Sequence, residues 1–490
     1  MYKLRIISFI LVFVFMTLMV ASCQAQKPDN ADVSGTTEVT DTGGDGANPE
    51  PVTEPEKVFP HEIRDLDGYN FRVLFDENEG NALTYEDLGV EEEIGEVYND
   101  SLYRRNIELK EKFNITFTSV GKDGIANDVK KIVNAGSDEY DLIVPRLNSA
   151  WGLIPYCNDL MPLQNLSLKE SWYDQNIIET LSIANKLYTI TGDAFMKHYD
   201  GIMLMIFNKQ LLMEHGMNDP YTLVREGKWT LDTMGEMVKT VAKDLDGNGE
   251  MDRYDQWGYV LQSDVLGGMI NAAGLQFMYK DSDDVPYTMA NTERMSGTID
   301  KILSFYNDYS WDCLRDGKGA HMSAFWVFPE GRALFNGIML RYIQWQLRGV
   351  EFDFGILPFP KFDEAQERYY TSTNDFHTFC YMMPKSVSDP ETVAYIFDAM
   401  GFYGEKIIKP AYYDLCLMRK YTRDDDSNEM LDIIFKSTTY DLGLYANFGN
   451  ISGSVRSMLE KGTNDYVSTY EKIEAKVTTA IEKFITNIEE

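Results

Sequence analysis

Two kinds of apolar pattern alternate along the first part of the chain. Strands are predicted over 69–75, 115–120 and 140–144, where apolar and β-branched residues are concentrated. Between these ranges, apolar residues recur three or four positions apart over 94–113 and 125–133, as they do on one face of a helix. This β-α-β-α-β order predicts a parallel sheet with helices on its faces.

A second series of strands and helices is predicted from residue 202 onward. Its expected strands cover 202–207, 257–261, 352–359 and 376–382, and its expected helices cover 209–215, 230–243, 296–306, 390–400 and 466–487. Strands that alternate with helical patterns again favour a sheet covered by helices. The fold class is therefore α/β, and 490 residues are enough for two cores.

The N-terminal segment has the pattern of a signal peptide. Lys3 and Arg5 precede an apolar run over 6–20, which is shorter than the roughly 20 residues that a membrane-spanning helix needs. The run ends in Val-Ala-Ser-Cys at 20–23, which resembles the lipobox of bacterial lipoproteins. That resemblance implies removal of residues 1–22 and a lipidated Cys23 at the mature N-terminus. The alternative is an ordinary signal peptide with an incidental cysteine.

Residues 23–57 are rich in Gly, Pro, Thr and acidic residues and are predicted to be a disordered linker, because they contain too few apolar side chains to form a core. With the lipid as its only membrane anchor, the protein is expected on the extracytoplasmic face of the cell membrane. Its net charge of −33 argues against nucleic acid and anionic lipid headgroups as partners.

The cysteines and histidines do not indicate a zinc site or a catalytic centre. Apart from Cys23, the cysteines Cys157, Cys313, Cys380 and Cys416 are scattered, and we interpret them as buried thiols whose three alternative pairings the sequence does not separate. The five histidines have no metal-ligand spacing. The sequence also has no phosphate-binding loop, no G-x-S-x-G and no G-x-G-x-x-G.

Several short segments beyond residue 60 carry a resemblance to a known family. They are YDLIV at 140–144, FNKQLL at 207–212, GKWTLD at 227–232, DGNG at 246–249 leading to WGY at 257–259, EGRALF at 330–335 and GILPFPK at 355–361. Their order and spacing resemble the extracellular solute-binding proteins of ABC importers, the group that includes maltose-binding protein and its oligosaccharide-binding relatives. The resemblance covers nearly the whole chain past residue 60.

The resemblance implies a periplasmic-binding-protein-like fold of two α/β lobes with the ligand in the cleft between them. The chain would cross a hinge near 192–201, near 371–379 and at roughly residue 420. One lobe would comprise 58–195 and 376–420, and the other 200–372 and 422–490. The segment 155–181 has no clear counterpart in maltose-binding protein. The implied function is that of a monomeric, non-catalytic protein that captures a neutral oligosaccharide and delivers it to an ABC permease in the membrane.

Ligand-binding residues are expected where the strands of a parallel sheet end, because ligands bind beyond the carboxyl ends of such strands. Sugars need flat aromatic faces and planar polar groups. The candidates are Asp76, Glu77, Asn148 and Trp151 in one lobe, Tyr259 and Arg341 in the other, and Asn374, Asp375 and His377 at the hinge.

The loop 244–255 matches the ligand positions of a calcium-binding loop. Its candidate ligands are Asp244, Asp246, Asn248, the Glu250 carbonyl, Asp252 and Asp255. Asp255 stands where an EF-hand has Glu, so water is an alternative ligand at that position. The functional interpretation is a structural Ca²⁺ site, and the alternative is an acidic turn without an ion.

Two other functions remain open from the sequence. A secreted carbohydrate-acting enzyme, such as a glycosidase with two catalytic carboxylates, is one alternative, because 78 acidic residues provide many candidate pairs. A protein of the same fold that binds a peptide or polyamine is another, because a fold does not determine its ligand.

Overall fold

The computed structural model describes residues 57–77, 88, 90, 92–262, 265–288, 292–312, 326–347, 349–413 and 424–489. Apart from Lys57, these residues belong to one compact unit, Val58–Glu490. The predicted signal peptide, the lipidated Cys23 and the linker up to residue 56 lie outside the described residues, as do Cys313 and Cys416.

The first sheet has three parallel strands in the order β2-β1-β3. They are β1 (Tyr69–Asp76), β2 (Ile115–Lys122) and β3 (Leu142–Val144). The helices α2 (Val97–Phe113) and α3 (Ala126–Asn134) connect them in sequence. The predicted β-α-β-α-β order is therefore confirmed, and the carboxyl ends of the three strands lie along one edge of the sheet, as expected for parallel strands.

Local sequence explains where α2 begins and ends. At its start the Glu96 side chain accepts a hydrogen bond from the Asn99 backbone N–H, at 3.1 Å, which satisfies a group that has no partner within the helix. At its end Asn114 adopts a left-handed conformation with φ of 50°, which asparagine tolerates better than most residues. Leu109 and Phe113 on one face of the helix are buried, so packing of this face adds to its stability.

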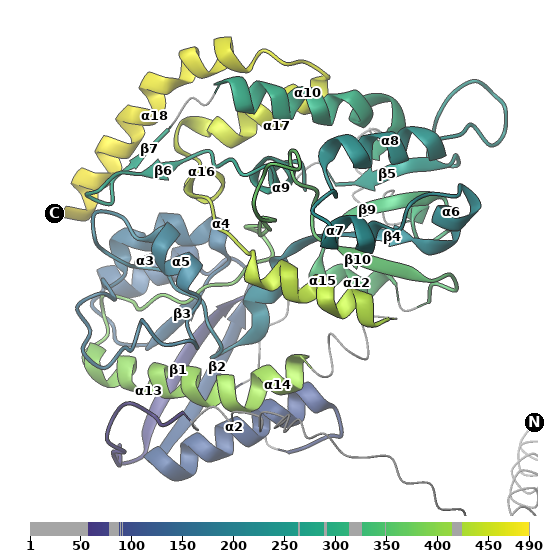
Figure 1. Ribbon diagram of the computed structural model, residues 1–490. Coiled ribbons are helices and arrows are strands. Elements are labelled where there is room, and N and C mark those ends of the chain that lie inside the picture. Colours follow the sequence, from purple (N-terminus) through teal and green to yellow (C-terminus); the bar gives the residue numbers. More distant parts are fainter. Residues whose placement is uncertain are drawn as a thin grey trace, which may run out of the picture. The chain divides into compact units, whose positions relative to one another are not determined.

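The second sheet is mixed and has five strands in the order β10-β4-β9-β5-β8 (Figure 1). These strands are β4 (Met203–Asn208), β5 (Trp257–Leu261), β8 (Ser310–Asp312), β9 (Ala333–Met339) and β10 (Phe354–Leu357). β4 runs antiparallel to β9 and β10, whereas β5 runs parallel to β8 and β9. Every residue of β4, β5 and β9 is buried, as expected for strands covered on both faces.

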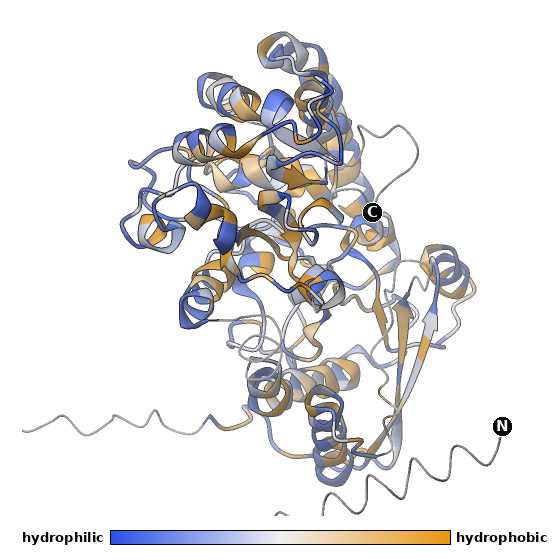
Figure 2. Cartoon of the chain, turned by 90° about the vertical axis from the view of Figure 1, so that its right-hand side faces the viewer, coloured by the Kyte–Doolittle hydropathy of each residue, from blue (hydrophilic) through white to orange (hydrophobic). Residues whose placement is uncertain are grey.

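Helices cover the sheets and form the connections between strands. Beside the first sheet lie α4 (Leu147–Ala150), the 3₁₀ helix η2 (Trp151–Tyr156), α5 (Gln175–Leu181), α13 (Pro390–Tyr403) and α14 (Lys409–Tyr412). The remaining helices named below are α8 (Leu231–Val241), α9 (Val265–Ala272), α10 (Thr292–Tyr309), α12 (Leu340–Gln346), α15 (Asp425–Lys436), α16 (Leu442–Tyr445), α17 (Ile451–Lys461) and α18 (Tyr466–Glu489). Figure 2 shows apolar colour along strands and polar colour over much of the helical surface.

Some predicted elements differ from those observed. The range 376–382 is not a continuous strand: Phe379 and Met382 form single bridges with Arg146 and Ile143. Pro145 lies between those two partners; its carbonyl accepts from the Cys380 N–H, but proline has no N–H to donate in return, so the ladder is interrupted. The strand β9 and the helices α9, α12, α15 and α17 were not predicted.

Two predicted hinge segments lie side by side. Ile202 forms a bridge with Thr373, and the Asn374 N–H donates to the Gly201 carbonyl at 2.8 Å. Thr371 forms a further bridge with Thr438. We call the elements around the three-stranded sheet the first lobe and those around the five-stranded sheet the second lobe. The predicted crossing near residue 420 lies outside the described residues, and the lobe boundaries stay predictions.

The segment 155–181 is attached to the first lobe through Asp398 of α13. This carboxylate is fully buried. It accepts hydrogen bonds from the Ser167 backbone N–H at 2.9 Å and hydroxyl at 2.8 Å, from the Trp172 indole at 3.2 Å and from the Tyr173 hydroxyl at 2.9 Å. His61 Nε2 lies 3.0 Å from the same group. A single charge therefore orders several distant parts of the chain.

The burial of two cysteines can be compared with the sequence analysis. Cys157 and Cys380 are free, buried thiols, as predicted. Among the described helices, none is both long enough and apolar enough to span a bilayer.

We predict that Asp398→Asn lowers the free energy of unfolding by about 3 kcal/mol, because an amide accepts fewer hydrogen bonds than a carboxylate and directs its own N–H groups at buried donors. Urea denaturation of the two proteins measures the change. Glu482→Gln, on the exposed side of α18, is the matched control and is expected to leave the unfolding midpoint unchanged. Equal midpoints for Asp398→Asn and the wild type would contradict the anchoring role.

Candidate functional site

A cavity of about 230 Å³ opens beside the hinge. Its lining comes from the hinge segment, from the start of β4, from α9 and from the region of α16 and α17. The lining residues are Met203, Gly267, Thr373, Asn374, Asp375, Leu444, Asn447, Ser452, Gly453 and Arg456. We call it the hinge cavity. Six of these ten residues have polar side chains, and Met203 and Leu444 add apolar surface.

The hinge segment at the cavity is held in place by its own hydrogen bonds. The Asn374 side-chain oxygen accepts from the backbone N–H groups of Phe376 and His377, at 3.0 and 3.1 Å. The Asp375 carbonyl accepts from the backbone N–H of Asn148 in α4, at 3.0 Å. Two predicted site residues from distant parts of the chain, Asn148 and Asp375, are thereby brought together, and of the two Asp375 lines the hinge cavity.

The predicted pair Arg341 and His377 is also brought together. Arg341 Nη1 lies 3.2 Å from His377 Nδ1, and the Tyr342 hydroxyl lies 3.1 Å from His377 Nε2. Burial, together with the positive charges of Arg341 and Arg146, lowers the pKa of His377 to about 3, so its imidazole is neutral near pH 7. Nδ1 therefore accepts from the guanidinium, and the proton on Nε2 is donated to Tyr342. This arrangement fixes the orientation of Arg341.

Asp76 has a different role from the one predicted. It is only 1% exposed, and its carboxylate forms a two-pronged ion pair with Arg146, with distances of 3.0 and 3.1 Å. The Gly124 N–H donates to the same carboxylate at 3.0 Å. The prediction of Asp76 as a direct ligand contact is wrong in this structure, because its oxygens bind and orient Arg146. The sequence analysis missed Arg146, although it follows β3 at the predicted ligand-binding edge.

Glu77 lies at the same edge of the sheet, directly after β1. Its backbone N–H donates to the Lys122 carbonyl at 2.9 Å, which continues the β1–β2 ladder by one step. Glu77 is partly buried. The ligand-binding role of Glu77 stays a prediction.

The two predicted aromatic ligand contacts are engaged elsewhere. Tyr259 on β5 has no exposed surface, so its prediction as a ligand contact is wrong: it is a core residue between the sheet and α9. Trp151 is partly buried and stacks on Phe484 of α18, with ring centroids 4.8 Å apart and an angle of 24°. Phe448 meets the Trp151 ring edge-on at 5.6 Å. The stacking predicted with a sugar is therefore made with the chain's own aromatic residues.

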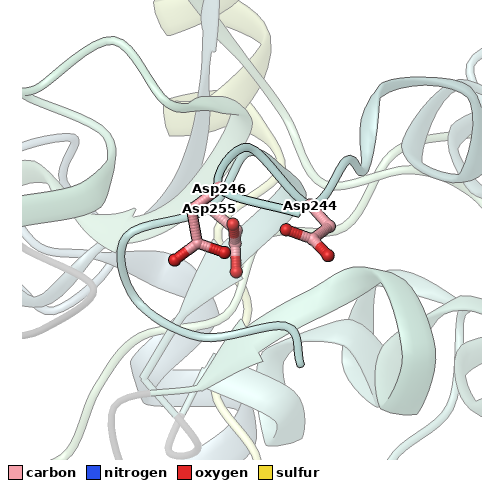
Figure 3. A group of neighbouring side chains, drawn as sticks. All are labelled: Asp244, Asp246 and Asp255. Carbon is pink, nitrogen blue, oxygen red and sulfur yellow. The ribbon is translucent and has the colours of Figure 1, made fainter. Parts of the chain in front are cut away.

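The acidic loop brings together three of the predicted calcium ligands. Carboxylate oxygens of Asp244, Asp246 and Asp255 lie within 4.8 Å of one another, and Figure 3 shows these side chains gathered in the loop. Oxygen ligands at 2.3–2.6 Å from one Ca²⁺ are at most about 5 Å apart, so the three groups fit a shared ion. Asp255 is buried, whereas Asp246 is exposed.

Other atoms of the loop are engaged in turns. The Asp252 carboxylate accepts from the Tyr254 N–H at 2.7 Å, and the Asn248 side-chain oxygen accepts from the Glu250 N–H at 2.6 Å. The Asp255 carboxylate accepts from the N–H groups of Leu245 and Asp252. These bonds position the carboxylates without an ion, so both interpretations of the loop stand, and the calcium assignment stays a prediction.

Known proteins resemble this chain in structure rather than in sequence. No protein-family model and no curated protein matches the sequence. A sugar transporter from Rhizobium etli in an open conformation matches with a TM-score of 0.56 at 11% identity, over 86% of this chain and 99% of that one. UspC from M. tuberculosis matches with a TM-score of 0.55 at 14% identity, over 84% of this chain and all of that one.

A third solved structure, an ABC substrate-binding protein from Listeria monocytogenes in complex with cycloalternan, has a TM-score of 0.53 at 11% identity, covering 86% of this chain and all of that one. Identities this low show the fold alone. The chain has the two-lobe, periplasmic-binding-protein-like α/β fold that the sequence predicts, with helices flanking the sheet of each lobe.

We predict that Ca²⁺ binds the loop of Asp244, Asp246 and Asp255 and raises the melting temperature of protein that has been stripped with EDTA, because a ligand of the folded state stabilises it by mass action. Calorimetric titration with CaCl₂ measures the affinity. Asp246→Ala should weaken it about tenfold or more, since it removes one charged ligand. Asp465→Asn, an exposed residue before α18, is the control. Absence of both heat and thermal shift would leave the loop as an acidic turn.

Proposed function

We propose that this protein captures an oligosaccharide in the hinge cavity and delivers it to an ABC permease in the membrane. The observation that carries the proposal is a cavity beside the hinge in which six of the ten lining residues have polar side chains. The fold supports it, because this chain resembles proteins whose descriptions name sugars as their cargo or ligand. We further propose that the protein acts as a monomer and without catalysis.

The side chains of the hinge cavity match the hydrogen-bonding needs of sugars. Each sugar hydroxyl both donates and accepts, so a sugar site needs groups of both kinds. Asp375 provides carboxylate acceptors, Asn447 an amide and Arg456 a planar donor. Met203 and Leu444 add apolar surface suited to the C–H faces of a sugar ring. This composition favours a neutral, hydroxyl-rich ligand.

The position of the cavity links ligand binding to lobe closure. Asp375 lies in the hinge and is hydrogen-bonded through its backbone to Asn148 of the first lobe, whereas Arg456 belongs to α17 beside the second. The lining residues belong to the hinge and the second lobe, and a ligand there that also contacts the first lobe would bind the closed arrangement more tightly than an open one and shift the equilibrium toward closure. A permease could then distinguish the loaded protein from the empty one.

A glycosidase with the same cleft is the competing function. Two carboxylates flanking a sugar about 5–10 Å apart would be required for that chemistry. Among the described residues that line the hinge cavity, Asp375 is the one carboxylate, whereas that chemistry requires two. The proposal of a binding protein therefore requires fewer assumptions about the site.

The test is calorimetric titration of the mature protein with a panel of neutral oligosaccharides, combined with chromatography of each glycan after prolonged incubation. We expect saturable binding of at least one glycan and recovery of that glycan intact. Hydrolysis products would move the protein to the enzyme class. Binding of peptides or polyamines with no binding of any glycan would replace the ligand class.

For the bound glycan, we predict that Asp375→Ala weakens affinity about tenfold or more, because it removes a charged acceptor whose hydrogen bonds are each worth about 1.5–3 kcal/mol. Asp465→Asn, an exposed residue that does not line the cavity, should bind like the wild type. Unchanged affinity of Asp375→Ala would place the glycan outside the hinge cavity.

For the membrane attachment, we predict that protein isolated from membranes begins at a diacylated Cys23, because the basic start, the short apolar run and Val-Ala-Ser-Cys occur in the order of a lipoprotein signal. Mass spectrometry of the N-terminal peptide measures this directly. Cys23→Ser should release the protein from the membrane fraction or leave its signal peptide uncleaved. An intact Met1 on the wild-type protein would contradict the prediction.

A further inference from the structure

A second cavity, of about 320 Å³, lies on the other face of the hinge strand. Ile202 lines this cavity, whereas the next residue, Met203, lines the hinge cavity. Successive side chains of an extended segment point to opposite faces, and Ile202 is extended and bridged to Thr373. The two cavities are therefore separated by the hinge itself and share no lining residue. We call the second one the rear cavity.

The rear cavity has aromatic walls from both lobes and from α14. Its aromatic lining residues are Tyr173, Tyr199, Tyr413, Phe435 and Tyr440. The Phe435 ring meets the Tyr199 ring edge-on, with ring centroids 5.1 Å apart. It also lies against the Tyr413 ring at a tilt of 56°, with centroids 5.6 Å apart. These three rings therefore form one connected surface. Aromatic faces attract cations through their negative π-surface and also pack against hydrocarbon.

Asp174 contributes a partly buried carboxylate to this cavity. Its oxygens accept from the Tyr440 hydroxyl at 2.8 Å and from the Asn176 N–H at 2.9 Å. Burial nevertheless raises the pKa of Asp174, although these hydrogen bonds oppose the shift. Within the described residues it forms no direct ion pair with Lys or Arg. A cationic ligand would stabilise the carboxylate charge, which burial deprives of part of its hydration.

His198 adds a second acceptor. It is 4% exposed and lines the rear cavity. Its Nδ1 lies 3.1 Å from the Phe195 carbonyl and must carry the proton of that hydrogen bond. Burial lowers the pKa of His198 to about 3, so the ring is neutral near pH 7 and Nε2 keeps a lone pair. Among the described residues no partner of Nε2 occurs.

The cations already present compensate these acceptors only in part: the charge of Lys409 opposes the rise in the pKa of Asp174 but does not overcome the effect of burial. Lys409 Nζ forms an ion pair with Asp193 at 2.8 Å, and burial still raises the pKa of Asp193 to about 6 despite that pairing. Lys436 lines the cavity from an exposed position, where water solvates its charge. The chain's net charge of −33 attracts small cations from solution generally.

We propose that the rear cavity binds a small organic ammonium ion, with the ammonium group paired to Asp174 and donating to His198 Nε2, and with the carbon chain against the tyrosine and phenylalanine rings. A primary ammonium has three N–H donors, which suits a site rich in acceptors. The proposal does not depend on the ligand of the hinge cavity, because the two cavities have separate linings.

The test is calorimetric titration of the mature protein with n-butylammonium chloride near pH 7, with butan-1-ol as the uncharged ligand of similar shape. We expect saturable binding of butylammonium and none of butan-1-ol. Asp174→Asn should weaken butylammonium binding about tenfold or more, because it removes the charge of a charge-assisted hydrogen bond. Asn caps helices as well as Asp does, and its oxygen still accepts from Tyr440, so this variant is expected to fold.

Two controls distinguish the rear cavity from general surface attraction. Glu482→Gln removes an exposed carboxylate and should leave butylammonium affinity at the wild-type value. Glycan affinity of Asp174→Asn should also equal that of the wild type, which shows an intact hinge cavity and separates this proposal from the proposed sugar binding. Absence of saturable butylammonium binding would overturn the proposal, as would equal affinity of Asp174→Asn and the wild type.

Discussion

The close approach of two chain segments at Gly201 is the constraint on which this structure depends. A Cβ atom there would lie 2.1 Å from the Thr378 hydroxyl oxygen and 2.9 Å from the Asn374 carbonyl, both too close for any side chain. Glycine allows the Asn374 N–H to reach the Gly201 carbonyl and the two hinge crossings to pack side by side. The lobes, the hinge cavity and the rear cavity are all placed relative to this contact.

Charges around the hinge are oriented before any ligand binds. Arg146 is held by Asp76, and Arg341 by a neutral His377. In both cases a buried partner fixes a long, flexible side chain in one direction, which reduces the entropy lost when a ligand is bound. The Asn374 side chain is likewise held in one orientation, because its oxygen accepts a hydrogen bond from the Phe376 backbone N–H.

The two lobes also touch away from the hinge. Trp151 of the first lobe stacks on Phe484 of α18, and the Lys186 ammonium donates to the Ile488 carbonyl at 2.6 Å. These contacts must be counted in the free energy of any opening motion, since separating them exposes apolar surface to water. The C-terminal helix therefore influences the equilibrium between lobe arrangements in addition to completing the second lobe.

The sequence by itself determined the parallel β-α-β-α-β start, the approximate limits of those helices that it predicted and the adjacency of the hinge segments, because local periodicity, caps and family resemblance express these features directly. It also placed Arg341, Asp375 and His377 near one another. Only the tertiary structure decided that Asp76 pairs with Arg146, that Tyr259 is a core residue and that Trp151 stacks on Phe484. Each of these outcomes depends on which distant side chain comes within contact, and no local pattern in the sequence carries that information.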